Sequence, residues 1–239
     1  MFVYIDLVFY ILIFIAFLFG ISAQVKVNTT FNRYKDFYPQ NNQPSETAIK
    51  NLLETAGLNN IKLASIKGEL TDNYNPKTKT ISLSESTQKN ASVASLGVVA
   101  HEIGHAMQDK GGYAPLKIRN AIVPWAKFGS IAFYPLFIIG LIMLFVSSTT
   151  LLGRILIYSS TTLYFLSTLF YIVTLPVERD ASKRAIELLK NSGSLNNEEL
   201  HYAQEVLKAA ELTYVSALIT SLLYFLRFLF YVTRILKRN

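Results

Sequence analysis

The residues best suited to chemistry lie in one short stretch, Ala100 to Met107, which reads A-H-E-I-G-H-A-M. His101 and His105 are four residues apart, so on an α-helix they project from the same face, one turn apart. Two imidazoles at this spacing can bind one zinc ion, and Glu102 can reach a metal-bound water without becoming a ligand. The pattern H-E-x-x-H therefore predicts a zinc site with Glu102 as general base.

A helix must position these side chains, and the flanking sequence has the signals for one. Ser92 can cap its N-terminus, and small or apolar residues recur at helical spacing between positions 93 and 104. Gly111 and Gly112 can then end the helix. The histidines are therefore expected well inside a buried helix, where two unpaired imidazoles would be costly unless something binds them.

The composition is typical of a membrane protein. Hydrophobic residues make up 51% of the 239 residues and charged residues only 16%. Four segments carry at most one charge and have about the 20 residues that cross a hydrocarbon core, namely 1–21, 128–146, 155–175 and 212–232. The first lacks the basic start of a secretory signal peptide, so we expect a retained helix. The fourth contains Arg227 and could instead be a buried amphipathic helix.

These segments predict a fold class that is mainly α and membrane-integrated, with about four transmembrane helices. We expect a transmembrane helix over 1–21, a catalytic region over 22–127 and a transmembrane hairpin over 128–175 with its turn at 147–154. A helical region over 176–211 follows, with Pro176 in its first turn, and 212–239 forms a last transmembrane helix with a basic tail. The absence of cysteine excludes disulfides and thiolate ligands.

The catalytic region also contains a predicted β-hairpin. Residues 61–70 and 79–83 have strand character, and turn-forming residues 71–77 join them. The hairpin and the H-E-x-x-H helix would make this region α+β. The edge strand could bind an extended peptide through its backbone, or the hairpin could only cover the core.

A catalytic zinc site needs a third protein ligand, which must come from elsewhere in the chain. Glu178 and His201 are the candidates. Two predicted membrane crossings separate His105 from Glu178 and return it to the side of the histidines, but His201 meets the same topological condition. His201 and Tyr202 could instead donate hydrogen bonds to a transition state. Asp180 could orient a ligand side chain.

Several stretches match a known family, and together they cover most of the chain. They are V-K-V-N-T-T-F at Val25, G-E-L-T-D-N-Y-N-P at Gly68, I-S-L-S-E at Ile81, S-V-A-S-L-G-V-V-A-H-E-I-G-H-A-M-Q at Ser92, L-K-I-R at Leu116 and L-P-V-E-R-D-A-S at Leu175. The sequence resembles the YugP-like neutral zinc metallopeptidases of bacterial membranes and, more distantly, HtpX-type membrane gluzincins. The resemblance implies a zinc-dependent endopeptidase with His101, His105 and Glu178 as ligands and Glu102 as the catalytic glutamate.

Two positions depart from the pattern of these families. The usual turn is similar to T-D-H-Y-D-P, and here Asn73 and Asn75 replace its histidine and aspartate. Gluzincins often have an acid four residues after the ligand glutamate, where this chain has Ser182. Asp180 is the candidate to take over the role of that acid.

These residues predict a zinc-dependent membrane endopeptidase that acts on membrane or membrane-proximal proteins through a metal-activated water. The alternative is a non-hydrolytic scaffold or transporter with a structural metal, although structural sites normally have four protein ligands and no adjacent base. The net charge of +7 lies mostly beside the apolar segments, which favours anionic lipid over nucleic acid as a partner. The same ligand types would also accept manganese, cobalt or iron.

The basic residues close to the predicted spans indicate an orientation in the cell membrane. Eleven lie on the side of the motif, at positions 26, 33, 35, 117, 119, 127, 179, 183, 184, 190 and 208, and four on the other side, at positions 154, 234, 237 and 238. This imbalance favours a cytoplasmic active site.

Two charged residues fall inside the predicted spans. Asp6 and Arg227 should lie at similar depth if the spans alternate in direction, and each charge would be costly alone. We therefore predict that Asp6 and Arg227 form an ion pair.

Overall fold

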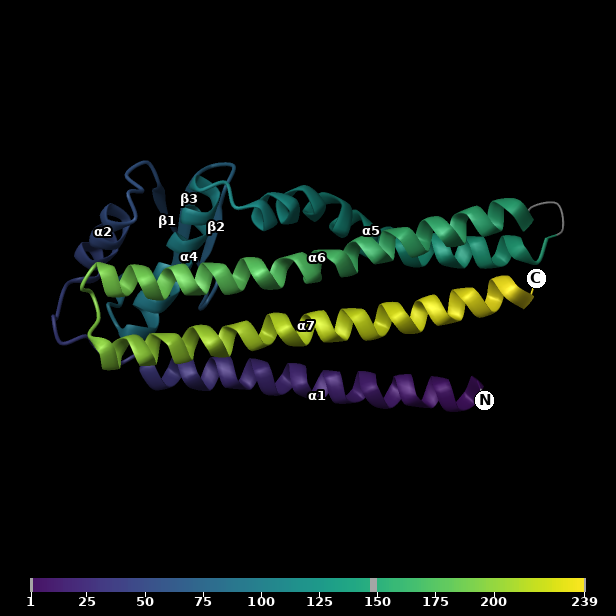
Figure 1. Cartoon of the computed structure of the whole chain (residues 1–239), viewed down its shortest axis with the longest axis horizontal. Coiled ribbons are helices and arrows are strands. Elements are labelled where there is room, and N and C mark those ends of the chain that lie inside the picture. The colour runs from purple at the N-terminus through teal and green to yellow at the C-terminus, as the bar shows by residue number, and fades with distance from the viewer. Residues whose placement is uncertain (1, 147–149, 239) are drawn as a thin grey trace. The chain divides into compact units, whose positions relative to one another are not determined.

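The computed structural model describes residues 2–146 and 150–238, which are mainly helical (Figure 1). Residues 1, 147–149 and 239, which belong to the predicted first span, hairpin turn and basic tail, lie outside the described residues. The helices are α1 (Phe2–Tyr34), α2 (Ser45–Thr55), α3 (Glu85–Lys89), α4 (Val93–Lys110), α5 (Ala114–Leu144), α6 (Thr150–Asn191) and α7 (Asn197–Arg238), and the strands are β1 (Lys62–Ile66), β2 (Asn73–Asn75) and β3 (Thr80–Ser84).

The chain forms two compact units. Unit 1 comprises Met1–Ile21, Lys117–Leu175 and Tyr214–Asn239, and unit 2 comprises Ser22–Leu116 and Pro176–Thr213. Each unit is therefore built from segments that are far apart in the sequence.

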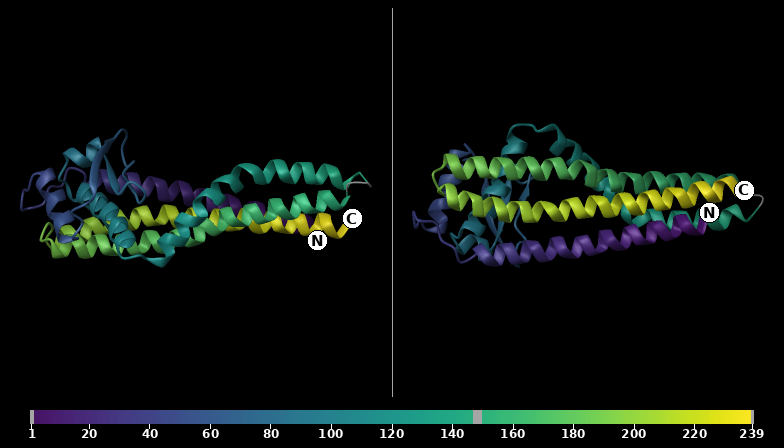
Figure 2. Two further views of the ribbon diagram at one scale, coloured as in Figure 1. Left: turned by 90° about the horizontal axis from the view of Figure 1, so that it is seen from above. Right: turned by 60° about the horizontal axis from the view of Figure 1, so that its bottom comes forward.

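Unit 1 consists of helix segments from α1, α5, α6 and α7 that run beside one another (Figure 2). α5 and α6 approach closely at Gly129, where an added Cβ would lie 2.6 Å from the carbonyl oxygen of Leu163. α6 and α7 meet through aromatic rings, including Tyr164 and Phe225 with centroids 5.7 Å apart. Small residues and aromatic rings therefore form the contacts between these helices.

The helices of unit 1 have the length and composition of membrane spans. α1, α5, α6 and α7 each contain an apolar window long enough to cross a bilayer. Large apolar side chains cover their outer surface, and Ile131, for example, is 76% exposed. Such a surface is costly in water and favourable among lipid tails. The prediction of a mainly α, membrane-type fold with four candidate spans is confirmed.

Two local predictions for α6 are wrong. The predicted turn extends to Arg154, but α6 already begins at Thr150. The sequence also predicts that Pro176 begins a new helix, whereas α6 continues through it to Asn191. Proline has no N–H to donate to the carbonyl four residues earlier, which normally breaks a helix. Here the next turn is buried in the core of unit 2, with Val177 fully buried, so packing maintains the helix.

The sheet of unit 2 differs from the predicted hairpin. It has three strands in the order β1-β3-β2. β1 and β3, predicted as an antiparallel pair, are parallel, and the antiparallel partner of β3 is β2, which lies in the predicted turn. Gly68 and Leu70 have φ of 108° and 53° and reverse the chain before β2. A strand of three residues is too short to show an alternating pattern, so the sequence did not reveal it.

α4 forms the centre of the core of unit 2. Its buried residues pack against α2, β3 and the parts of α6 and α7 that belong to this unit. An added Cβ at Gly104 would lie 2.5 Å from the carbonyl oxygen of Ala181, so only glycine permits this contact with α6. The predicted ends of the helix are confirmed: the Ser92 hydroxyl accepts a hydrogen bond from the N–H of Ser95, and Gly111 is the C-cap.

Candidate metal centre

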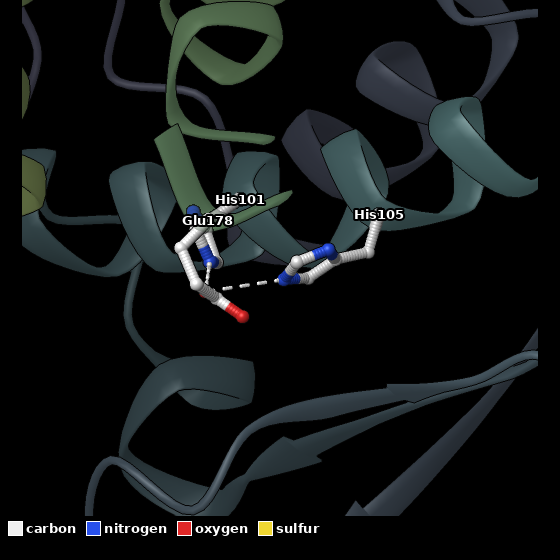
Figure 3. A group of neighbouring side chains, drawn as sticks. All are labelled: His101, His105 and Glu178. Carbon is white, nitrogen blue, oxygen red and sulfur yellow. Dashed lines mark hydrogen bonds and ion pairs between the residues drawn. The ribbon is translucent and has the colours of Figure 1, made fainter. Parts of the chain in front are cut away.

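Three side chains from two helices converge in unit 2 (Figure 3). His101 and His105 lie on consecutive turns of α4, and Glu178 approaches them from α6. The Glu178 Oε2 atom is 3.2 Å from the Nε2 of His101 and 3.5 Å from the Nε2 of His105. One ligand atom from each residue lies within 4.8 Å of the other two.

The spacing of these atoms fits a zinc ion. Ligand atoms about 2.0–2.1 Å from zinc in a tetrahedral site lie roughly 3.3–3.4 Å from one another. The two separations from Glu178, 3.2 and 3.5 Å, bracket this value. Two imidazoles and one carboxylate are also the ligand set of many catalytic zinc sites, in which a fourth position stays open for water. His101, His105 and Glu178 could therefore hold a zinc ion with little rearrangement.

The electrostatic environment keeps Glu178 ionised. The residue is buried, and burial by itself would raise its pKa. Hydrogen bonds with His101 and His105, together with their charges, outweigh burial and hold the pKa of Glu178 well below its usual range. A metal ligand must be deprotonated, so Glu178 is in the required state at neutral pH.

A polar partner orients each histidine ring through its Nδ1 atom. Gln108 Oε1 lies 3.0 Å from the Nδ1 of His105, and Ser182 Oγ lies 3.2 Å from the Nδ1 of His101. An amide oxygen can only accept, so the Nδ1 of His105 carries the proton. In the neutral ring Nε2 is then the nitrogen that can ligate a metal ion.

The amide of Gln108 is buried and is held by a partly buried network. Its Nε2 donates to the carbonyl oxygen of Val177 and to Asp180 Oδ2, both at 2.8 Å. Arg184 Nε donates to the same oxygen of Asp180 at 2.6 Å. These bonds leave the Oε1 of Gln108 to accept from His105. Asp180 therefore acts on the histidine through Gln108 and not by direct contact.

Sequence reasoning missed the contacts of Gln108 and Ser182 with the two histidines. Gln108 follows His105 by three residues and so lies on the same face of α4. Ser182 follows Glu178 by four residues on α6 and occupies the position where the family pattern led us to expect an acid. Helical spacing from each proposed ligand is the signal that could have found both.

Glu102 is buried next to the three candidate ligands, and its carboxyl group has a raised pKa. Burial raises its pKa to about 7, although the charge of His101 opposes the shift. Glu178 and Asp72 add to the increase, whereas a backbone hydrogen bond with Tyr74 opposes it. A carboxyl group with a pKa near 7 can both accept and return a proton at neutral pH.

The two other predicted candidates, His201 and Tyr202, and Asn75, which departs from the family pattern, lie outside this group. The His201 side chain is exposed, and its Nε2 lies 3.2 Å from Glu205 Oε1. Tyr202 donates a hydrogen bond to Glu198 and stacks on Tyr34 in a separate cluster. Asn75 Oδ1 accepts a hydrogen bond from the N–H of Lys77 within its own turn. The geometry therefore gives these three residues no contact with the candidate metal ligands.

Comparison with known proteins gives two similarities. A family described as "Putative neutral zinc metallopeptidase" matches residues 9–233. A protein of Bacillus subtilis (strain 168), "Putative membrane protease YugP", is 34% identical over 206 residues, which cover 86% of this chain and 88% of the relative. No solved structure is significantly similar to the chain. Both matches extend over the converging residues of α4 and α6 and over most of the chain.

Proposed function

The chain belongs to the family described as "putative neutral zinc metallopeptidase", and on this premise we propose that it is a zinc-dependent membrane endopeptidase with His101, His105 and Glu178 as ligands. The cofactor of this family is Zn²⁺. The observation that carries the proposal is the convergence of three ligand atoms within 4.8 Å, with the two separations from Glu178, 3.2 and 3.5 Å, suiting one tetrahedral zinc ion. A closed structural site would need a fourth protein ligand, and this group in the described part of the chain contains three residues.

In this proposal Glu102 transfers the protons of the reaction. When bound, zinc supplies an activated water and polarises the substrate carbonyl. Glu102 takes a proton from the attacking water and returns it to the leaving amine, so that the peptide bond breaks as a carboxylate and an amine form. A pKa near 7 suits both transfers. Gln108 and Ser182 keep the Nε2 atoms of the histidines directed toward the reaction site.

We further propose that β2 positions the substrate. It is an edge strand of the sheet, with β3 on one side only. The backbone of Tyr74 in this strand interacts with Glu102, so β2 runs past the proposed base. An extended peptide that paired with the free edge would therefore lie next to Glu102.

The proposed substrates are membrane or membrane-proximal proteins. Glu178 follows the apolar part of α6 after only a few residues of the same helix, so chain connectivity keeps this ligand near the end of a span. The name of the relative from B. subtilis, "Putative membrane protease", agrees with such a location. The excess of basic residues on the motif's side supports a cytoplasmic active site.

Proteolysis and zinc content, measured together, test this function. The purified full chain should contain one zinc and cleave membrane-protein fragments faster than soluble casein. Glu102→Gln should keep the zinc and lose at least about 100-fold in cleavage rate, because proton transfer by a positioned side chain contributes this much. Glu187→Gln, which changes an exposed glutamate of α6, is the matched control and should behave as wild type. Equal cleavage by Glu102→Gln and wild type would refute the peptidase function.

A further inference from the structure

Unit 1 contains a pocket that the proposed reaction does not use. Its volume is about 280 Å³, near the lower end of the range for ligand pockets, roughly 300 Å³. Seven of its eight lining residues are aromatic and come from α5, α6 and α7, among them Phe137, Tyr164 and Phe228. The eighth is Arg227, so a largely apolar cavity has one cationic group in its wall.

The charge of Arg227 is not neutralised by any described residue. The side chain makes neither a hydrogen bond nor an ion pair within residues 2–146 and 150–238, and its Nε is buried. Its guanidinium carbon lies 4.0 Å from the centre of the Tyr10 ring, so stacking on α1 holds it in place. Arg227 is also the only charged residue of segment 212–232. A cation in a membrane span is costly unless an anion pairs with it.

The predicted ion pair between Asp6 and Arg227 is wrong, and the register of two helices explains why. α1 and α7 are antiparallel neighbours, with the rings of Phe9 and Phe230 6.3 Å apart. In this register Asp6 lies beside Arg234, and its Oδ2 is 3.8 Å from the Nη1 of that arginine. Arg227 is two helical turns away on α7. Asp6, the one acid of this α1 segment, therefore pairs with Arg234 and not with Arg227.

We propose that this pocket binds an acidic phospholipid from the surrounding bilayer. The phosphate would pair with the guanidinium of Arg227, and part of an acyl chain would lie on the aromatic wall. The hydroxyl groups of Tyr224 and Tyr231, which also line the pocket, offer further donors to phosphate. This inference requires that the helices of unit 1 lie in a bilayer and is independent of the peptidase function.

Charge and position select this occupant. A zwitterionic lipid brings its own cation, whereas an acidic lipid has a net charge that balances Arg227. Arg227 lies seven residues, about 10 Å, before Arg234 in the basic end of α7, so its guanidinium lies at a depth that a lipid phosphate near the interface can approach. The pocket therefore offers an apolar wall to a lipid chain and a cation to its headgroup.

Native mass spectrometry of the delipidated full chain in detergent tests the proposal. The protein would be titrated with phosphatidylglycerol and phosphatidylcholine of identical acyl chains. We expect one phosphatidylglycerol per chain, bound at least about tenfold more tightly than phosphatidylcholine. Arg227→Gln should remove this preference. Lys237→Gln, which removes an exposed cation from the same end of α7, should keep it.

Further variants keep the test decisive. Thermal unfolding in detergent reports the folding of each variant, because Arg227 and the pocket belong to unit 1. If Arg227→Gln does not fold, Phe228→Leu replaces it, and this change to the aromatic wall should weaken phosphatidylglycerol binding by about threefold or more. Equal binding of the two lipids by wild type, or an unchanged preference in a folded Arg227→Gln, would overturn the proposal. Displacement of the lipid by an acidic peptide substrate would also overturn it, because the pocket would then be a substrate site.

Discussion

Unit 2 and unit 1 both hold charged side chains away from water, but they stabilise them in different ways. In unit 2 the carboxylate of Glu178 contacts two histidines, and each histidine has its own polar partner. In unit 1 the guanidinium of Arg227 rests on an aromatic ring and has no hydrogen bond from the described chain. The first arrangement is preorganised by the protein, and the second leaves part of the interaction to the surroundings.

This difference shows how the two units can serve different ligands. A metal site needs fixed ligand atoms, and a partly buried hydrogen-bond network such as Gln108–Asp180–Arg184 supplies that rigidity. A lipid is flexible and abundant in the bilayer, so an aromatic wall and one cation are sufficient for recognition. Changes in unit 2 should therefore have strongly coupled effects, and changes in unit 1 should have weaker and more independent ones.

Replacing the proposed carboxylate ligand should have the largest effect. Glu178→Gln should lower zinc affinity by more than about 100-fold, because changes to the partners of metal ligands alone cost about 10–100-fold. Titration against a competing chelator would measure this loss. His201→Ala is the matched control, since His201 is exposed and contacts Glu205, and its zinc affinity should equal that of wild type. A loss in His201→Ala instead would identify a different third ligand.

The pKa of Glu102 predicts a pH dependence of stability in the metal-free protein. Its pKa is about 7 in the folded chain and 4.5 as the reference value, so the folded state binds this proton more tightly. That contribution, up to about 3 kcal/mol, is complete below pH 4.5 and is lost as the pH rises through 7. With chelator present, wild type should lose stability relative to Glu102→Gln over this range. Parallel thermal melting curves in detergent across these pH values would contradict the prediction.

The contribution of Glu178 has the opposite sign. Its pKa is lowered on folding, so its stabilisation is present above pH 4.5 and is lost as the pH falls below that value. Above pH 4.5 this term is constant, and it is shared by wild type and Glu102→Gln. The difference between the two melting curves therefore reports Glu102 together with its coupling to His101 and Glu178.

Substitutions in the hydrogen-bond network that holds His105 should have an intermediate effect on zinc affinity. Gln108→Leu has a similar shape but cannot hold the Nδ1 proton of His105, so zinc affinity should fall by about 10–100-fold. Gln108→Glu keeps an acceptor and should bind zinc more tightly than Gln108→Leu. Because Asp180 acts through Gln108, Asp180→Asn should weaken zinc binding in wild type and have less effect in Gln108→Leu. Additive losses would show that the two residues act separately.

Breaking the ion pair between Asp6 and Arg234 in unit 1 should have the smallest effect on stability. Asp6 and Arg234 are partly exposed and 3.8 Å apart, so their coupling energy should be below about 1 kcal/mol. A double-mutant cycle with Asp6→Asn and Arg234→Gln, followed by thermal unfolding, would measure it. The same cycle with Arg227→Gln should give no coupling to Asp6. A coupling of several kcal/mol in either cycle would contradict the expectation that changes in unit 1 have weak and independent effects.

The sequence by itself determined the features that depend on neighbouring residues. Spacing of four residues placed His101 and His105 on one face of a helix, and Ser92 and Gly111 marked its ends. The apolar segments indicated four candidate spans because their length is matched to a bilayer. From the residues alone Glu178 was the favoured third ligand, because it closely follows a predicted span, and His201 stayed open as the alternative; the family resemblance also pointed to Glu178.

The tertiary structure decided what depends on register between distant segments. It brought Glu178 to the histidines, gave them Gln108 and Ser182 as partners, and placed β1 parallel to β3. It also gave Asp6 a different arginine from the one expected. Successive residues on a helix point about 100° apart, so a shift of one or two residues between packed helices changes which side chains meet. That shift is set by side-chain packing along the whole contact and not by local sequence. Between α1 and α7 this packing places Asp6 beside Arg234 and leaves Arg227 two turns away.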